Sequence, residues 1–131
     1  MSHDSGLGSP GEWLKRARSN LALARQPRTE EIYWEDLCFE TQQAAEKALK
    51  AVLIASGIRF RFVHDLAELM TLIENNDVSI PNDVRRASAL TDYSVEARYP
   101  GPFEPVTEEE FREALSLAEA VVAWAEGMVA R

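Results

Sequence analysis

Apolar residues recur along most of the chain at intervals of three and four positions, and this spacing places them on one face of an α-helix. No segment shows sustained alternation of apolar and polar residues, so we expect essentially no β-strand. Glycines and prolines are few, and they stand between the periodic segments, where helices begin and end. The pattern predicts five helices, over about residues 10–25, 29–56, 65–76, 81–98 and 107–129.

Short polar residues stand at four of the expected helix starts. Ser9, Thr29, Asp65 and Thr107 can each accept a hydrogen bond from a backbone amide of the first turn. Gly57 ends the second helix, because glycine readily adopts the left-handed conformation that follows many helices. Three prolines stop the fourth helix, since a proline lacks the amide hydrogen that a helix interior requires. They are Pro100, Pro102 and Pro105.

Each predicted helix has one face on which we expect the core to form. In the second helix this face consists mostly of alanine, and such small side chains let a neighbouring helix approach closely. That face predicts either a tightly packed partner helix within the bundle or a self-association surface. The expected inner residues are Trp13, Ala17, Leu21 and Ala24; Leu37, Thr41, Ala44, Ala48, Ala51 and Ala55; Leu66, Leu69, Met70 and Ile73; Val84, Ala87, Leu90, Thr91 and Val95; and Phe111, Leu115, Ala118, Val122, Ala125 and Val129.

The five helices predict an all-α fold, an up-and-down four-helix bundle with a fifth short helix. The chain has 131 residues, of which 46% are hydrophobic, so it is long enough for one sizeable core and too apolar to be disordered. We expect residues 1–9 to form a flexible N-terminal tail and residues 10–131 to form a single helical domain.

Composition also bears on the compartment. No uninterrupted apolar run approaches the roughly 20 residues that span a bilayer, so no membrane segment is expected. The first eleven residues carry neither a basic start nor an apolar stretch, and we therefore expect no secretory signal. Cys38 is the single cysteine, which excludes an internal disulfide and fits a reducing compartment. Together these features predict a cytoplasmic location.

The charge is acidic overall but unevenly distributed. The formal net charge of −8 argues against a general nucleic-acid binder, because neutralising phosphates requires clustered Lys and Arg. Basic residues nevertheless gather between residues 12 and 28, whereas acidic residues dominate between residues 104 and 126. Both an ordinary set of solvated helix faces and a local basic surface remain compatible with this distribution.

Several kinds of chemistry are disfavoured by the residues present. The two histidines, His3 and His64, do not follow a glutamate by three positions, as a di-iron bundle requires. A zinc site of Cys and His ligands needs more than one cysteine, and the chain has neither a phosphate-binding loop nor a glycine-rich dinucleotide turn. We therefore expect no metal centre and no bound cofactor. Cys38 lies beside an apolar helix face, which favours a buried, inert thiol over a catalytic pair with His64.

His64 is the histidine with the most informative surroundings, because it follows Arg59 and Arg61 and enters the third helix. One interpretation is a helix-entry residue that hydrogen-bonds the backbone. The other is a general acid or base, or a phosphate ligand, since an ordinary imidazole titrates near pH 6.5. In the second case the arginines would stabilise negative charge on a phosphate. Metal-independent RNA cleavage requires these two kinds of group.

The segment at residues 97–100, Ala-Arg-Tyr-Pro, is a second candidate site. Arg98 at a helix C-terminus interacts favourably with the helix dipole, and a following proline commonly ends a helix. Alternatively, Arg98 is a phosphate ligand and Tyr99 is a ring on which a base stacks. The sequence leaves both interpretations open.

Three segments together resemble the HEPN family (higher eukaryotes and prokaryotes nucleotide-binding). Residues 43–51, Gln-Ala-Ala-Glu-Lys-Ala-Leu-Lys-Ala, resemble the signature of that family on its second helix. His64-Asp65-Leu66 with Leu69 resembles its His-x-Leu-x-x-Leu helix start, and Tyr93 with residues 97–100 resembles its Tyr…Ala-Arg-Tyr-Pro end. The order and spacing also match, and the resemblance runs from about Trp13 to Trp124.

The resemblance implies an α-helical bundle that is often a homodimer and is commonly paired with a minimal nucleotidyltransferase as a toxin–antitoxin system. Catalytic members are metal-independent RNases whose motif is Arg, four to six residues, then His, at a dimer interface. Arg59 and His64 match that spacing, although Phe60 stands where the motif has a polar residue. Arg61, Arg98, Tyr99 and Lys50 are the candidate nucleotide- or phosphate-binding residues.

Three functions follow as hypotheses. The first is a nucleotide- or partner-binding component of a nucleotidyltransferase toxin–antitoxin pair, favoured by the signature without a full RNase motif. The second is a metal-independent RNase toxin that uses Arg59 and His64, and the third is a purely structural dimerisation module. The polar residues of the second helix bear on this choice, because they cannot all face one core and some must face solvent, a dimer mate or a ligand. They are Gln42, Gln43, Glu46, Lys47 and Lys50.

Overall fold

The computed structural model describes residues 8–94 and 105–131, and within these residues the regular secondary structure is helical, with no β-strand. This confirms the all-α prediction. The elements, in chain order, are α1 (Pro10–Ala24), α2 (Trp34–Ala55), α3 (Leu66–Glu74), α4 (Asn82–Arg85), the 3₁₀ helix η1 (Arg86–Tyr93) and α5 (Glu108–Val129). Among the described helices, none combines the length and the apolar character that crossing a bilayer requires.

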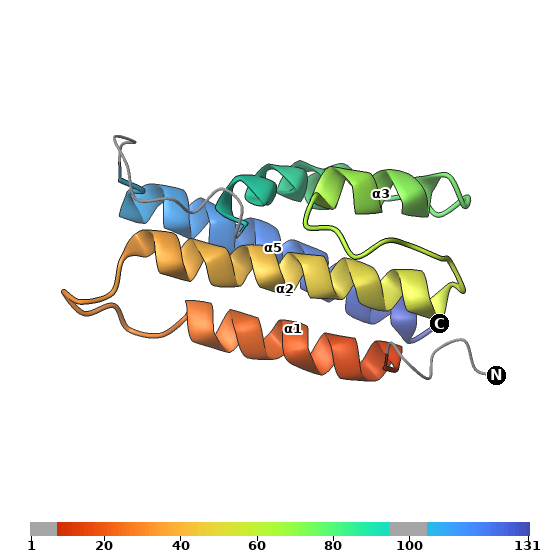
Figure 1. Cartoon of the computed structure of the whole chain (residues 1–131), viewed down its shortest axis with the longest axis horizontal. Helices are drawn as coiled ribbons and strands as arrows, with labels where there is room; N and C mark the ends of the chain where they lie inside the picture. Colours follow the sequence, from red (N-terminus) through yellow and green to blue (C-terminus); the bar gives the residue numbers. More distant parts are fainter. Residues whose placement is uncertain (1–7, 95–104) are drawn as a thin grey trace.

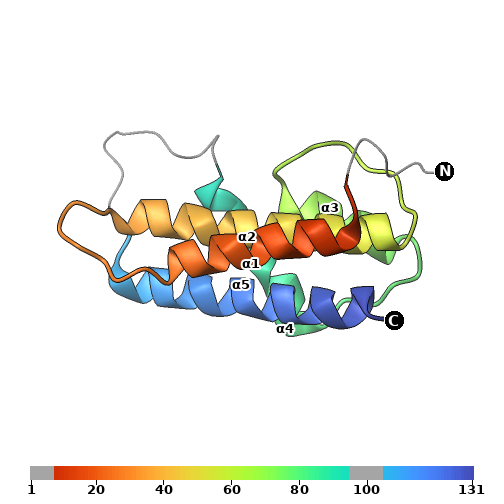
Figure 2. The same ribbon diagram turned by 90° about the horizontal axis from the view of Figure 1, so that it is seen from below.

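The helices form the up-and-down bundle that the sequence predicts. α1, α2, the α4–η1 segment and α5 alternate in direction, and α3 is the additional short helix (Figure 1). α2 lies at the centre and packs against α1, α5, α3 and η1. α1 and α5 lie side by side in the view turned by 90° (Figure 2), with α3 and η1 on the far side of α2.

The alanine-rich face of α2 is the middle of the core, as expected. Ala44, Ala48 and Ala51 are fully buried, and so is Ala45 beside them. Small side chains there let the neighbouring helices lie close to the α2 backbone. Ala55, at the last residue of α2, was expected to face inward but is exposed, because it lies where the bundle ends.

Three of the predicted helix starts are confirmed by their hydrogen bonds. The Ser9 hydroxyl accepts from the Glu12 amide at 3.1 Å, and the Asp65 carboxylate accepts from the first amides of α3. Thr107 and Glu110 form a reciprocal capping box at the start of α5. Gly57 follows α2 with a φ of +70°, as a helix-ending glycine should.

The second helix begins later than the sequence predicts, at Trp34 rather than near Thr29. The Thr29 carbonyl instead accepts from the Ile32 amide at 3.1 Å, which closes a turn and places Ile32 against the core. Trp34 then packs against Phe111 of α5, with ring centroids 5.2 Å apart. These tertiary contacts, absent from any local signal, decide where the helix starts.

The predicted fourth helix over residues 81–98 is only one α-helical turn, followed by the 3₁₀ helix η1. Val84, Ala87 and Leu90 are buried, as expected. They stand three positions apart, which is the repeat of a 3₁₀ helix and was visible in the sequence. The expected inner residue Val95 lies outside the described residues.

Candidate functional site

A row of buried polar side chains runs along one face of α2. Gln42, Glu46 and Lys50 are spaced four residues apart, so they are neighbours on the helix surface. All three are buried in a core that is mostly apolar. Burying such groups is costly unless each one finds a hydrogen-bond partner. The prediction that some polar side chains of α2 leave the core is confirmed for Gln43 and Lys47, which are half-buried. Gln42, Glu46 and Lys50 are instead joined to one another inside the core.

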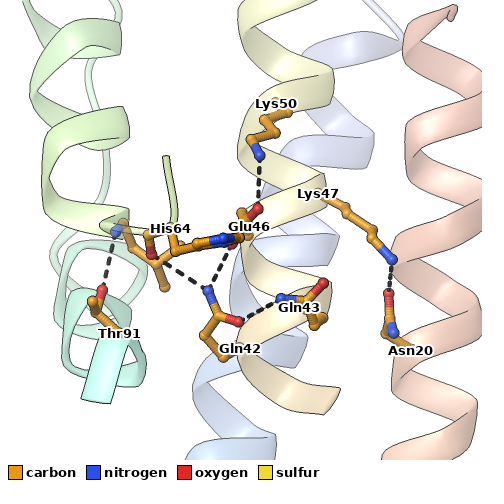
Figure 3. A network of polar contacts seen from close by, with 9 residues as sticks. Asn20, Gln42, Gln43, Glu46, Lys47, Lys50, His64 and Thr91 are labelled. Carbon is orange, nitrogen blue, oxygen red and sulfur yellow. Dashed lines mark hydrogen bonds and ion pairs between the residues drawn. The ribbon is translucent and has the colours of Figure 1, made fainter. Parts of the chain in front are cut away.

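Glu46 is the centre of this network (Figure 3). Its Oε2 atom accepts from Lys50 Nζ at 2.7 Å, and its Oε1 atom accepts from Gln42 Nε2 at 2.8 Å. His64 Nδ1 lies 2.9 Å from the same Oε1 atom. Gln43 Nε2 donates to Gln42 Oε1 at 2.8 Å, which fixes the orientation of the Gln42 amide. Both carboxylate oxygens are therefore engaged.

The surroundings of Glu46 keep it ionised. Burial raises the pKa of its carboxyl, but hydrogen bonds from Lys50, His64 and Gln42 lower it by more, so the net pKa lies below the ordinary value. An ionised carboxylate only accepts hydrogen bonds. The Nδ1 atom of His64 is therefore the proton-bearing nitrogen of this contact.

His64 connects this buried network to the surface. The chain leaves α2, turns and runs back along it, which brings His64 beside Glu46, 18 residues earlier (Figure 1). The His64 carbonyl accepts from Gln42 Nε2 at 3.4 Å, while its side chain is 45% exposed. His64 is thus a helix-entry residue and also an imidazole oriented by a carboxylate. With Nδ1 donating to Glu46, Nε2 is the other ring nitrogen, which accepts a hydrogen bond or a proton while the ring is neutral and donates to an anion only once it is protonated.

Lys50, a predicted phosphate ligand, is buried at the inner end of the network. Its ammonium is paired with Glu46, and its side chain is 4% exposed. Two rings cover it: the Nζ atom lies 5.8 Å from the ring centroid of Trp13 and 5.2 Å from that of Phe62. Lys50 thus contacts the Glu46 carboxylate and the rings of Trp13 and Phe62, and its positive charge compensates the buried negative charge of Glu46.

The other predicted site residues are Arg59, Arg61, Arg98 and Tyr99, of which the structure describes the first two. Arg59 is exposed, and the described residues show no hydrogen bond or ion pair on it. Arg61 is exposed and pairs with Glu68 at 3.0 Å. Arg98 and Tyr99 fall outside the described residues. The structure therefore joins His64 to Lys50 through Glu46, and it places the two arginines on the segment that leads to His64.

A second network, between α1 and α2, escaped the sequence analysis. Asn20 is buried, donates to Glu40 Oε1 at 2.6 Å and accepts from Lys47 Nζ at 2.9 Å. Burial lowers the pKa of Lys47, while the carboxylates of Glu40 and Glu46 raise it. The nearby cations Arg16 and Lys50 also lower it, and the net pKa lies below the ordinary value. The available signal was Asn20 itself, three residues after Ala17 on the inner face of the first helix.

Cys38 is the buried thiol that the sequence predicts. Burial, together with the charges of Glu110 and Glu35, raises its pKa to about 12, so it stays protonated near neutral pH. It lies beside Tyr93, whose pKa burial also raises, to about 12. Neither group belongs to the network around Glu46.

Comparison with known proteins identifies the family. Residues 11–128 match the family model of the HEPN domain. The chain belongs to the HEPN domain family. The prediction made from the signature at residues 43–51 is therefore confirmed, and this signature supplies Glu46 and Lys50, the ion pair of the buried network.

Relatives of this HEPN protein include one curated protein and solved structures. The chain is 29% identical over 124 residues to the protein named "Putative toxin MJ1304" of Methanocaldococcus jannaschii, covering 84% of this chain and 81% of that one. The structure of TT1696 from Thermus thermophilus has a TM-score of 0.78 and 34% identity, over 91% of this chain and 97% of that one. ST0689, described as an archaeal HEPN homologue, has a TM-score of 0.75 and 28% identity, over 94% and 99%.

Proposed function

We propose that this HEPN protein is the HEPN component of a toxin–antitoxin pair, and that it binds the phosphate of a ribonucleotide on the surface around His64. The main observation in favour of this binding site is the half-exposed imidazole of His64, which contacts the buried, ionised carboxylate of Glu46. Arg59 and Arg61 precede His64 in the chain. The similarity to the Methanocaldococcus jannaschii protein named "Putative toxin MJ1304" supports the assignment to a toxin–antitoxin pair. The proposed partner is a minimal nucleotidyltransferase, to which the bound nucleotide would be presented.

The buried network gives a physical reason for this assignment. A buried ion pair contributes little net stability, because removing both charges from water costs about as much as their attraction returns. Glu46 and Lys50 are therefore poorly explained as stabilising groups alone. Glu46 also orients His64, and a fixed ring binds a ligand with less loss of conformational entropy. The network is best explained as support for a surface site.

The binding proposal predicts that Arg59→Ala weakens ribonucleotide binding about tenfold or more, since a hydrogen bond to a charged group contributes about 1.5–3 kcal/mol. Arg59 is exposed, so the variant should fold normally. ATP and a single-stranded RNA oligonucleotide serve as separate probes, and each binding curve follows from the rise in melting temperature with ligand concentration.

Arg112→Ala is the matched control, because Arg112 is also exposed but lies on the first turns of α5, where it pairs with Glu108. The control should bind both probes as the wild type does. Equal affinities of wild type and Arg59→Ala for both probes would contradict the proposed site, as would no thermal shift at all with either probe.

A second candidate function is metal-independent RNA cleavage, and the contact between His64 and Glu46 favours it. An imidazole fixed by a carboxylate is a suitable general base for the ribose 2′-hydroxyl. For this candidate, His64→Ala should reduce cleavage of total RNA in excess chelator by about 10²–10⁴-fold. The measurement compares the initial rates of wild type and variant by gel. If the wild type leaves the RNA intact, cleavage is excluded and the binding function alone is retained. If the wild type and His64→Ala cleave at equal rates, His64 is excluded as the general base.

A further inference from the structure

The segment between α2 and α3 presents an aromatic ring to solvent. Residues 59–62 read Arg-Phe-Arg-Phe, and Phe62 is 64% exposed. Within residues 8–94 and 105–131, Leu23 and Tyr33 are the only other large apolar side chains that are exposed. Exposing a phenylalanine forfeits the favourable burial of its ring. The contacts that the ring makes within the chain therefore leave most of it open to solvent.

The Phe62 ring is nevertheless held in place. The Nζ atom of Lys50 lies 5.2 Å from its centroid, and the Phe60 ring meets it edge to face at 5.7 Å. Lys50 is in turn locked by Glu46, and two residues further on His64 bonds the same carboxylate. The ring thus lies against side chains that are connected through α2 to the core.

The charges beside this ring favour an anionic ligand. Arg59 and Arg61 flank Phe60 and lead to Phe62, and both are exposed. The neighbouring acids are already engaged: the Asp65 carboxylate accepts from the first amides of α3, and Glu68 pairs with Arg61. Arg59 has no such internal partner among the described residues. An acidic protein thus presents cations and a fixed ring on one short segment.

We propose that Phe62 is a platform on which a base of single-stranded RNA stacks, while Arg59 binds an adjacent phosphate. The inference rests on the proposed function and narrows its ligand class. Stacking on an aromatic ring tolerates any base, because every base has a flat face. A duplex already stacks its bases on one another, whereas a single strand leaves them available. The spacing of ring and cation along one segment suits a ligand that alternates bases and phosphates.

The experiment measures binding of a fluorescein-labelled single-stranded RNA to the full chain by fluorescence anisotropy. Phe62→Leu keeps an apolar side chain but removes the flat face, and it should weaken binding by roughly 10- to 100-fold. Phe62→Trp keeps a ring and should bind at least as tightly as the wild type. Tyr33→Ala is the control: Tyr33 is 66% exposed, but it directly precedes the first residue of α2, whereas Phe62 lies over Lys50 in the last turns of that helix. It should bind as the wild type does, and the same RNA annealed to its complement should bind weakly.

Three results would overturn this inference: equal affinity of Phe62→Leu and wild type, equal loss in Phe62→Leu and Phe62→Trp, or tight binding of the duplex. If the wild type binds ATP but not the RNA, the proposed ribonucleotide site stands and the stacking platform fails. If it binds neither, the proposed function fails as well. Because Phe62 is exposed, unchanged melting temperatures of the variants verify that the comparison concerns binding.

Discussion

Replacing Glu46 with glutamine is expected to lower the free energy of unfolding by about 3–5 kcal/mol, the usual cost of breaking a buried ion pair. The size of the effect comes from the partner that remains. Lys50 is 4% exposed, and its ammonium would keep its charge away from water with no anion beside it. The amide also removes the ionised acceptor of His64 Nδ1. Equilibrium unfolding in urea, followed by circular dichroism, measures the change.

Glu126→Gln is the matched control for this prediction. It makes the same chemical change in an ion pair with Arg18 whose side chains are 48% and 42% exposed, so the expected cost is about 0–1 kcal/mol. The double variant Glu46→Met with Lys50→Met should be more stable than Glu46→Gln, since no buried charge is left unpaired. A loss for Glu46→Gln as small as that of the control would show that water reaches the pair.

The pH dependence of this difference has a definite sign. The pKa of Glu46 is lower in the folded chain than its ordinary value of 4.5, so its ionisation stabilises the fold above that pH. The stabilisation is lost as the pH falls through the folded-state pKa. Glu46→Gln has no such titration. The gap between wild type and variant should therefore be constant near neutral pH and shrink below pH 4.5, and a gap that widened there would contradict the assignment.

Truncating Leu49 to alanine is expected to cost about 2–5 kcal/mol, which combines the lost burial with the cavity that remains. Leu49 is fully buried on α2, the central helix, which packs against α1, α3, α5 and η1. Leu49 belongs to the main hydrophobic core, where close packing lets the neighbouring side chains relax only partly into a cavity. The same urea titration measures the loss.

Leu23→Ala makes the identical change at a site on α1 that is 47% exposed, and it should alter the free energy of unfolding by no more than about 0.5 kcal/mol. Leu49→Met, which conserves most of the volume, should cost less than about 1.5 kcal/mol. If Leu49→Ala and Leu23→Ala were equally destabilised, the position of Leu49 in the core would be wrong.

The helices and most of their ends could be predicted because the signals are local. The Ser9 and Asp65 caps and the capping box of Thr107 act within three residues of themselves, and the structure confirms each. Periodicity likewise predicted the burial of Ala44, Ala48 and Ala51. A helix cap and the hydrophobic periodicity of a helix depend only on the residues of that helix. Both could therefore be predicted without knowledge of the rest of the fold.

The start of α2 shows where local signals fail. Thr29 is a good capping residue followed by two glutamates, yet the helix begins at Trp34, which has no side-chain cap. The packing of Trp34 on Phe111 joins positions 77 residues apart, and the turn at Thr29 places Ile32 on the core. A contact between distant segments outweighs a cap that contributes only about 1 kcal/mol.

For the candidate site, the sequence by itself determined the chemical groups: a helix carrying Glu46 and Lys50, and an entry to the next helix carrying His64. It also determined the HEPN family, whose signature includes these residues. Only the tertiary structure decided their partners. The chain turns after Gly57 and runs back along α2, which puts His64 on Glu46 and Phe62 over Lys50. The course of the chain after Gly57 depends on contacts between different segments and not on the hydrophobic periodicity of one segment. These contacts form only when the bundle is assembled.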